Sequence, residues 1–304
     1  MTETGSPDVA VGEPGRRRWP RVVGAIVGVA LIAGVATFVV LWNRGSARPV
    51  TMEEARSRAS TPSTDQSTDT QPLQTAPGVT EPVTTDQPTD TELLRPAPGV
   101  YLYSGEGTEH LDNPPLTQTQ GPGIPGTVTH LEGGCWRLRV DYSTNHWQSW
   151  DYCPASSGLT ENAGAFFQRL DLVVAQVDTS SSYTCDPPVD AIRATQRVGD
   201  QWMQECRGTS TGSDGEVISS GPYTFVGPER LDIAGTEVAA LHYHRLRNLT
   251  GAQTGTEDVN VWFDAATGLP LRNQRVITVR SSSLIGGVTY EENGSFQLTS
   301  MNPT

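Results

Sequence analysis

An apolar run from Val22 to Trp42 constrains this chain more than any other feature of its sequence. The run contains no charged residue, and at about 1.5 Å rise per helical residue it spans roughly 30 Å, the thickness of the hydrocarbon core of a bilayer. Arginines at positions 16, 17, 18 and 21 precede it, so we expect the N-terminus to stay in the cytoplasm and the rest of the chain to lie outside. The sequence predicts a single-pass protein of the cell membrane.

A cleaved signal peptide is the alternative reading of this run. Signal peptides have shorter apolar regions that end at small residues, whereas this run ends in the bulky residues Val39 to Trp42. No cysteine precedes Cys135, which excludes a lipid anchor on a nearby cysteine. We therefore favour an uncleaved signal-anchor helix. Gly24 and Gly28 within it match a small-xxx-small pattern and could support a homodimer.

Composition divides the chain into four parts. Residues 1–21 form the cytoplasmic tail, 22–42 the anchor, 43–96 a stalk rich in Thr, Ser, Pro and Asp, and 97–304 the exported domain. The stalk has too little apolar surface to offset its ordering entropy, so we expect it to be disordered, either as a bare spacer or as a carrier of O-linked sugars. A short helix over Met52–Arg58 is the one element we expect within it.

The charge of the exported domain argues against two classes of partner. From Ala97 onward it has 23 Asp and Glu residues against 12 Arg, within a chain whose formal net charge is −13. Such an acidic domain is poorly suited to nucleic acid and to adhesion to anionic lipid headgroups. The chain contains no lysine, and its many Arg, Ala, Gly and Val residues are typical of a GC-rich bacterial genome.

Four cysteines, all outside the predicted membrane span, indicate two disulfides. The segment from Cys135 to Cys153 consists of two alternating runs around Ser143–Asn145, and a three-residue loop there places Tyr142 opposite His146. The same register places Cys135 opposite Cys153. Cys185 then pairs with Cys206 by elimination. Metal binding by these cysteines is disfavoured because no Cys-x-x-Cys pair or closely spaced histidine accompanies them.

The exported domain is predicted to be mostly β. Strand-like runs rich in Val, Ile, Tyr and Phe are separated by turn residues. They cover Gly99–Tyr103, Thr127–Leu131, Glu216–Ser220, Tyr223–Val226, Val238–Arg245, Val259–Phe263, Leu271–Val279, Val288–Tyr290 and Phe296–Thr299. Leu159–Val177 fits either a helix or a strand, and periodicity alone does not decide between them.

Two patterns suggest chemistry. His242 and His244 lie two residues apart on one face of a predicted strand, as a pair of metal ligands would. Gly208–Gly212 fits the Gly-x-Ser-x-Gly nucleophile pattern but lacks the buried strand and helix that the motif needs. We expect no catalytic residue, metal or cofactor, and keep an exported hydrolase or metal-dependent enzyme that uses the two histidines as an alternative.

Asp258–Arg272 predicts a hairpin whose turn runs from Asp264 to Gly268 and whose return strand, which contains Pro270, starts at Leu269. Gly268 can adopt the positive φ that such a turn needs, while Asp264 and Thr267 can hydrogen-bond its backbone. This stretch resembles the W-x-D-x-x-T-G-L-P-L-R hairpin of the LolA/LolB-like superfamily, which includes periplasmic lipoprotein carriers, RseB/MucB-type regulators and mycobacterial lipid-binding lipoproteins. The layout of the chain also resembles that of exported membrane proteins of actinobacteria.

That resemblance implies a curved antiparallel sheet, an unclosed half-barrel that cups an apolar concavity around one or two helices. Trp136, Leu138, Trp150 and Tyr152 share one strand face and would line such a cup or form core. We therefore expect a non-enzymatic, membrane-tethered domain that binds a lipid-like ligand or a protein partner in the cell envelope. A structural envelope protein without a ligand is a further alternative.

Overall fold

The computed structural model describes residues 47–61, 94–171, 176–283 and 286–304, which belong to a unit spanning Ser46–Thr304. The predicted tail 1–21 and anchor 22–42, with Gly24 and Gly28, lie outside these residues. Within the described ranges, no helix is long and apolar enough to cross a bilayer.

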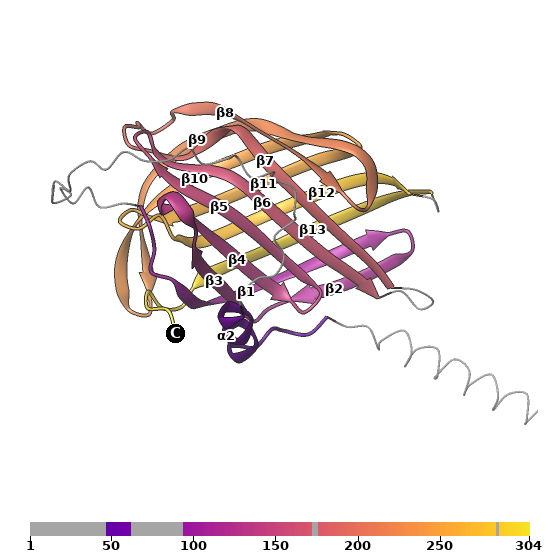
Figure 1. The fold of residues 1–304 in the computed structure, drawn as a ribbon, viewed down its shortest axis with the longest axis horizontal. Coiled ribbons are helices and arrows are strands. Elements are labelled where there is room, and N and C mark those ends of the chain that lie inside the picture. Colours follow the sequence, from indigo (N-terminus) through magenta and orange to yellow (C-terminus); the bar gives the residue numbers. More distant parts are fainter. Residues whose placement is uncertain (1–46, 62–93, 172–175, 284–285) are drawn as a thin grey trace, which may run out of the picture. The chain divides into compact units, whose positions relative to one another are not determined.

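Antiparallel β-strands form most of the described chain (Figure 1). One helix, α2 (Met52–Ser60), precedes them, and a short 3₁₀ turn, η2 (Glu132–Gly134), interrupts them. The strands are β1 (Gly99–Asp112), β2 (Pro115–Gln120), β3 (Gly123–His130), β4 (Trp136–Ser143), β5 (His146–Ala155), β6 (Gly158–Asp171), β7 (Gln176–Arg193), β8 (Gln201–Ser210), β9 (Ser213–Ile233), β10 (Thr236–Gly251), β11 (Gln253–Asp264), β12 (Pro270–Ser283) and β13 (Gly286–Leu298).

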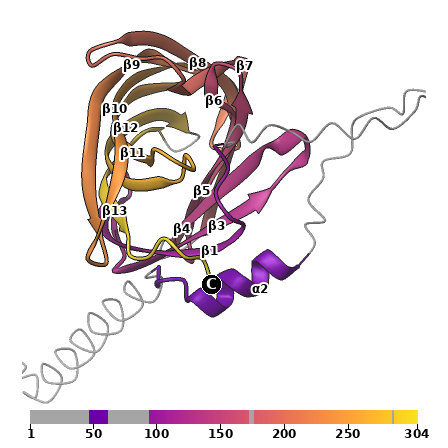
Figure 2. The same cartoon turned by 90° about the vertical axis from the view of Figure 1, so that its left-hand side faces the viewer.

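The sheet closes on itself through β1. This strand pairs with β3 through residues 99–104 and with β13 through residues 103–111, so its two edges are both occupied. Of the 13 strands described, all except β2 form the closed ring, which makes a 12-stranded barrel. β2 extends the same edge of β1 that β3 uses, through pairs from Gly107 to Asp112. Figure 2 shows the sheet curving round until β13 meets β1.

The closure shows that the predicted unclosed half-barrel is wrong, and with it the LolA/LolB-like assignment. A half-barrel leaves its first and last strands unpaired, whereas here β1 and β13 share nine residue pairs, from Tyr103–Leu298 to Leu111–Tyr290. Pairing the first strand with the last removes both free edges of the sheet. The one helix of the described chain, α2, is also not in the concavity, because it contacts the barrel through β1 and β3, and the packed part of the described interior consists mainly of side chains of the strands.

The register predicted for the β4–β5 hairpin is confirmed over most of its length. Trp136 pairs with Tyr152, and the same register continues to Asp141 opposite Trp147. The prediction is wrong at the tip, where Ser143 pairs with His146 and Tyr142 is the extra residue of a bulge. Both predicted disulfides are present, Cys135–Cys153 and Cys185–Cys206. Each joins residues that continue the register of their strands.

The ambiguous segment Leu159–Val177 is extended in its described part. It forms most of β6 and the start of β7, whose pairs run from Gly158–Arg193 to Asp171–Gln176. Small residues in β6 allow close contact with the neighbouring strand. A Cβ at Gly164 would lie only 2.2 Å from the hydroxyl of Tyr183. The aromatic pair Phe166–Phe167 suits a strand that is buried on one face.

Part of the predicted stalk belongs to the domain. Thr51 and Glu54 form a capping box that starts α2, and Ala55 is buried against Val50 and Val100. Arg58 donates to Asp141 of β4 at 2.8 Å. At the other end of the stalk, the carbonyl of Leu94 accepts a hydrogen bond from the indole of Trp136 at 3.0 Å. Residues on both sides of 62–93 therefore contact the barrel.

The barrel interior changes character along its length. On β13, Phe296 and Leu298 join an apolar core, Glu292 lies in a charged middle layer, and Tyr290 and Val288 line a cavity. The same layers recur on β12, where Leu271 lies in the apolar core, Arg275 in the charged layer and Ile277 in the cavity wall. One end of the barrel is therefore packed with aromatic and aliphatic side chains, while the other end is hollow.

Candidate ligand-binding cavity

The hollow end of the barrel contains a cavity of about 860 Å³. It reaches the β1–β2 turn at Asn113–Pro114 and the β8–β9 turn at Thr211–Gly212. Its wall is chemically divided between strands. Aliphatic side chains come mainly from β1, β6, β10, β12 and β13, whereas β7, β8 and β9 contribute mainly hydroxyl groups. The aliphatic residues include Leu111, Leu170, Leu249, Ile277, Val279 and Val288, and the hydroxyl residues include Thr179, Ser181, Thr209, Ser210, Ser213 and Ser219.

Two arginines of β10 lie at the floor of this cavity. Strand alternation turns Arg245 and Arg247 to the same face as Tyr243, which is fully buried in the core below. Both arginines contact the carboxylate of Glu161. The guanidinium of Arg245 lies 3.5 Å from Oε2 of Glu161, and that of Arg247 lies 3.5 Å from Oε1. Arg247 also donates to Oε1 of Gln204 at 2.7 Å. The side chains of Arg247 and Glu161 are only 3% and 4% exposed.

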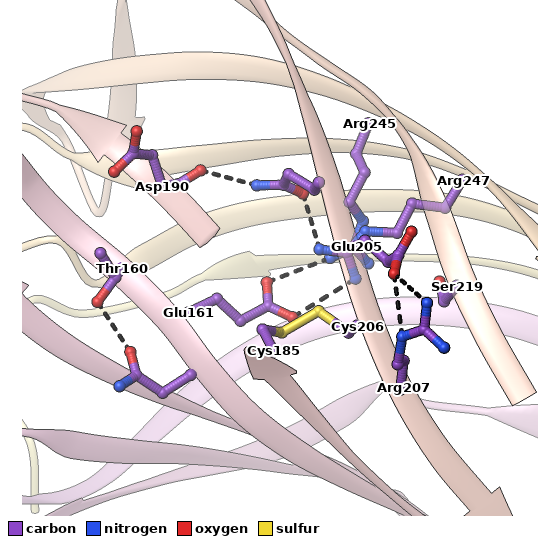
Figure 3. Close-up of a disulfide and its surroundings, with 12 residues drawn as sticks. Thr160, Glu161, Cys185, Asp190, Glu205, Cys206, Arg207, Ser219, Arg245 and Arg247 are labelled. Atoms are coloured by element: carbon purple, nitrogen blue, oxygen red, sulfur yellow. Dashed lines mark hydrogen bonds and ion pairs between the residues drawn. A yellow bond between two sulfur atoms is a disulfide. The ribbon is translucent and has the colours of Figure 1, made fainter. Parts of the chain in front are cut away.

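Glu161 reaches the interior because of a β-bulge. On the C-terminal side of the bulge, even-numbered residues of β6 such as Gln168 face inward and line the cavity. On its N-terminal side, the odd-numbered residues Leu159 and Glu161 face inward and are buried. The change occurs where Tyr152 pairs with Glu161 but Asp151 pairs with Ala163, which leaves Asn162 unpaired. Figure 3 shows both guanidinium groups converging on Glu161 beside the Cys185–Cys206 disulfide.

The position of the disulfide explains why a metal is not expected here. Glu161 lies within 4.8 Å of both sulfur atoms, which would form a three-ligand cluster if the cysteines were free. The sulfur atoms are bonded to each other, however, so no thiolate is available as a ligand. Cys206 contributes to the cavity wall as an apolar group instead.

A second buried polar network joins β1, β2 and β13. Glu109 accepts hydrogen bonds from Gln120 at 2.7 Å and Gln168 at 2.5 Å, and its Oε1 lies 2.7 Å from Nδ1 of His146. Gln120 also donates to Glu292 at 2.9 Å. This network ties β2 to the seam where the barrel closes, and it separates the core from the cavity.

The carboxylates around Arg245 keep its guanidinium charged. Burial by itself lowers the pKa of Arg245, but the nearby carboxylates of Glu161 and Glu257 outweigh burial and raise that pKa above its usual value. Glu257 lies directly opposite Arg247 in the β10–β11 register and also lines the cavity. The floor therefore combines a charged Arg245 guanidinium with the carboxylates of Glu161 and Glu257.

The predicted ligand cup lies in the core. Trp136, Leu138, Trp150 and Tyr152 all face the interior, as their alternation predicts, but they are at most 7% exposed and belong to the packed end of the barrel. The residues that line the cavity do not include them. The predicted turn is present at the same packed end, where Asp264 accepts hydrogen bonds from both the backbone and the hydroxyl of Thr267. Gly268 has a φ of 75°, and Pro270 begins β12.

The two histidines proposed for an enzyme lie on the outer face of β10. Because Tyr243 between them points inward, His242 and His244 point outward. Nδ1 of His242 lies 2.7 Å from Glu229, and its ring stacks on Trp262 at 4.0 Å. Nε2 of His244 lies 2.8 Å from Asp258. Each histidine thus has its own carboxylate, and neither lines the cavity.

Sequence reasoning did not identify Arg245, Arg247 or Glu161. A signal for the arginines was present, because Tyr243, Arg245, Arg247 and Leu249 alternate on one face of a strand. Two charges between apolar residues on one strand face indicate a buried polar site or a cavity. The sequence contains no comparable signal for Glu161, since its inward orientation depends on the bulge at Asn162.

Comparison with known proteins adds little beyond distant likeness. No protein-family model matches the chain, and no curated protein matches it. Among solved structures, the hypothetical lipoprotein YmcC from Escherichia coli matches with 14% sequence identity and a TM-score of 0.28, over 63% of this chain and 86% of its own. A likeness this weak leaves the function to be argued from the cavity.

Proposed function

We propose that this protein is an envelope-located binding protein whose barrel holds one amphipathic, lipid-like small molecule in its cavity. The observation that carries the proposal is an 860 Å³ cavity with an aliphatic wall on one side and a charged floor. That volume lies within the range of roughly 300–1,000 Å³ that is usual for small-molecule sites. An apolar wall with a few convergent polar groups is the usual composition of such a site.

Two further observations support the location and the non-catalytic role. The disulfides Cys135–Cys153 and Cys185–Cys206 suit an oxidising compartment outside the cytoplasm. The apolar run Val22–Trp42 would tether the barrel to the membrane, with the barrel on the outer side. Binding is preferred to catalysis because His242 and His244, the residues on which an enzyme was predicted to depend, lie on the outside of the barrel.

The proposal can be tested with a matched pair of variants on β12. Ile277 faces the cavity, whereas its neighbour Val276 is 52% exposed on the outer face. The full chain, exported with both disulfides formed, would be titrated with an uncharged naphthylamine dye that fluoresces in apolar surroundings. We expect stoichiometric binding to the wild type and to Val276→Trp, and at least about tenfold weaker binding to Ile277→Trp, whose indole projects into the cavity and obstructs the aliphatic wall.

Equal binding by the two tryptophan variants, or no binding by the wild type, would overturn the proposal. A protein partner in the envelope or a structural role without a ligand would then be the remaining explanations. Solvent extraction of the purified wild type, followed by mass spectrometry of the extract, would identify a molecule that co-purifies in the cavity. The same molecule should be depleted from extracts of Ile277→Trp.

A further inference from the structure

The cavity floor has more hydrogen-bond donors than acceptors. Nε of Arg245 and Nε of Arg247 are both buried and have no hydrogen-bond partner in the described part of the chain. A guanidinium has five N–H donors, and Gln204 accepts only one from Arg247. Glu161 lies 3.5 Å from each arginine, a loose contact for an ion pair, and its Oε1 also has no hydrogen-bond partner in the described part of the chain. One acceptor atom cannot satisfy the donors of two guanidinium groups, and a buried donor without a partner is unfavourable, so a ligand with acceptor atoms would be favoured here.

The charges of the most buried groups also favour a ligand with acceptor atoms at the floor. Arg245 and Arg247 share a single buried carboxylate, Glu161. The other deeply buried carboxylates have partners of their own, since Glu292 binds Arg275 and Glu109 lies against His146. Glu257 faces the same cavity but is only half-buried, and its Oε2 accepts a hydrogen bond from Ser219 at 3.4 Å. At the bottom of the cavity, one guanidinium charge thus lacks a counter-ion of equal burial.

Apolar side chains lie directly above the arginine pair. Leu249 follows Arg247 on the same strand face, and Ile277 and Val279 continue the aliphatic wall on β12. A single-chain amphiphile would therefore place its charged end at the floor and its chain along this wall. Charge-assisted hydrogen bonds between guanidinium groups and an acidic headgroup are stronger than bonds between neutral groups.

We infer that the ligand is a single-chain amphiphile with an anionic headgroup that binds Arg245 and Arg247 at the cavity floor. This inference rests on the proposed function, because it names the ligand class of the same cavity. The headgroup could be a carboxylate, as in a fatty acid, or a phosphate monoester, and both would accept several hydrogen bonds from the two guanidinium groups.

The test compares three ligands with the same chain, namely palmitate, palmityl phosphate and palmityl alcohol. Each would displace the naphthylamine dye from the full chain at mildly alkaline pH, where both acids are ionised. We expect the wild type to bind at least one of the acids about tenfold more tightly than the alcohol. The acid that is bound more tightly distinguishes a carboxylate from a phosphate ligand.

Variants of the floor then assign the preference to named residues. Arg247→Gln and Arg245→Gln should each weaken acid binding about tenfold, and should weaken acid binding more than alcohol binding, while Glu161→Gln should strengthen acid binding by removing a competing carboxylate. Arg207→Gln is the matched control, because Arg207 is an exposed arginine of β8 that pairs with Glu205 and Glu216. It should bind all three ligands as the wild type does.

The two proposals fail in different ways. Binding of acid and alcohol with equal affinity, with no effect of the arginine variants, would overturn the anionic headgroup and leave the binding function intact. Absence of binding by dye, acids and alcohol alike would overturn both. If Arg247→Gln does not fold, Arg245→Gln and Glu161→Gln test whether the headgroup binds at the floor. The first variant should weaken acid binding and the second should strengthen it, and these opposite effects are expected only from an anionic headgroup at this floor.

Discussion

Arg275 and Glu292 meet inside the barrel, where Nε of Arg275 donates to Oε1 of Glu292 at 2.6 Å. Their side chains are only 3% and 2% exposed. Arg275 also donates to Gln120 of β2 at 2.6 Å, and its guanidinium lies 3.9 Å from the ring centre of Tyr142. This ion pair joins β12 to β13 and connects them to the seam at which the sheet closes.

Loss of one partner of this pair should be costly. Arg275→Met leaves Glu292 buried without its cation, which we expect to lower the free energy of unfolding by roughly 3–5 kcal/mol. The double variant Arg275→Met/Glu292→Met removes both charges and should recover much of that loss. Urea denaturation of the three proteins measures both effects. A double variant less stable than the single one would contradict this account.

The closing seam depends on a residue without a side chain. A Cβ at Gly105 of β1 would lie 2.3 Å from the carbonyl oxygen of Ser295 and 2.8 Å from Ile124. Gly105→Ala should therefore push β1 away from β13 and destabilise the barrel by about 1–3 kcal/mol. Gly123→Ala is the control, since its Cβ would meet only a Leu102 methyl at 3.8 Å. Thermal unfolding should show a lower melting temperature for the first variant alone.

The two disulfides should contribute similarly to stability but differently to binding. They close sequence separations of 18 and 21 residues, and in the chain-entropy model each is worth about 3 kcal/mol. We expect a similar loss of stability for Cys135→Ala/Cys153→Ala and Cys185→Ala/Cys206→Ala. Dye titration should show altered affinity only for the second pair, because Cys206 lines the cavity. The prediction fails if the first pair changes the affinity as much.

Acid should weaken the barrel through Glu109. Burial alone would raise its pKa, but His146 and the amides of Gln120 and Gln168 outweigh burial and lower that pKa from 4.5 to about 2. A carboxyl whose pKa is lowered on folding stabilises the protein above its ordinary pKa, and this stabilisation is lost as the pH falls from about 4.5 towards 2.

Urea midpoints measured across this pH range test the assignment. The midpoint of Glu109→Gln should change less with pH than that of the wild type, because the variant has no proton to gain at this position. Glu106→Gln, an exposed residue on the outer face of the same strand, should behave like the wild type. Identical pH profiles for all three proteins would assign the acid sensitivity to other carboxylates.

Helix α2 should detach without unfolding the barrel. Ala55 is 1% exposed against Val50 and Val100, so Ala55→Glu would bury a charge in this contact. Since α2 contacts the barrel mainly through β1 and β3, with one hydrogen bond from Arg58 to Asp141 of β4, we expect local release. Hydrogen exchange of the α2 amides should accelerate at least about tenfold while exchange in β4–β13 stays unchanged. Ala59→Glu, at an exposed position one turn further along the same helix, should exchange as the wild type does.

Local patterns were sufficient for the β4–β5 hairpin and for both disulfide pairings. Alternation and a short loop set the pairs from Trp136–Tyr152 to Asp141–Trp147, because a slip of one residue would turn every apolar side chain to the wrong face. The same reasoning failed at Tyr142, where a bulge shortens the loop. A bulge depends on how the hairpin tip packs, which the alternation of residues does not report.

The sequence by itself determined that the part from Ala97 onward is built mostly of strands with alternating faces, because a side-chain period of two is a local property of extended chain. Only the tertiary structure decided that Tyr103 and Leu298, which are far apart in the chain, are paired, since closure depends on the twist and tilt accumulated over all the strands. Closure also decides which face is the interior. For that reason His242 and His244, which attracted attention in the sequence, are on the outside, while Arg245, Arg247 and Glu161 form the floor of the cavity.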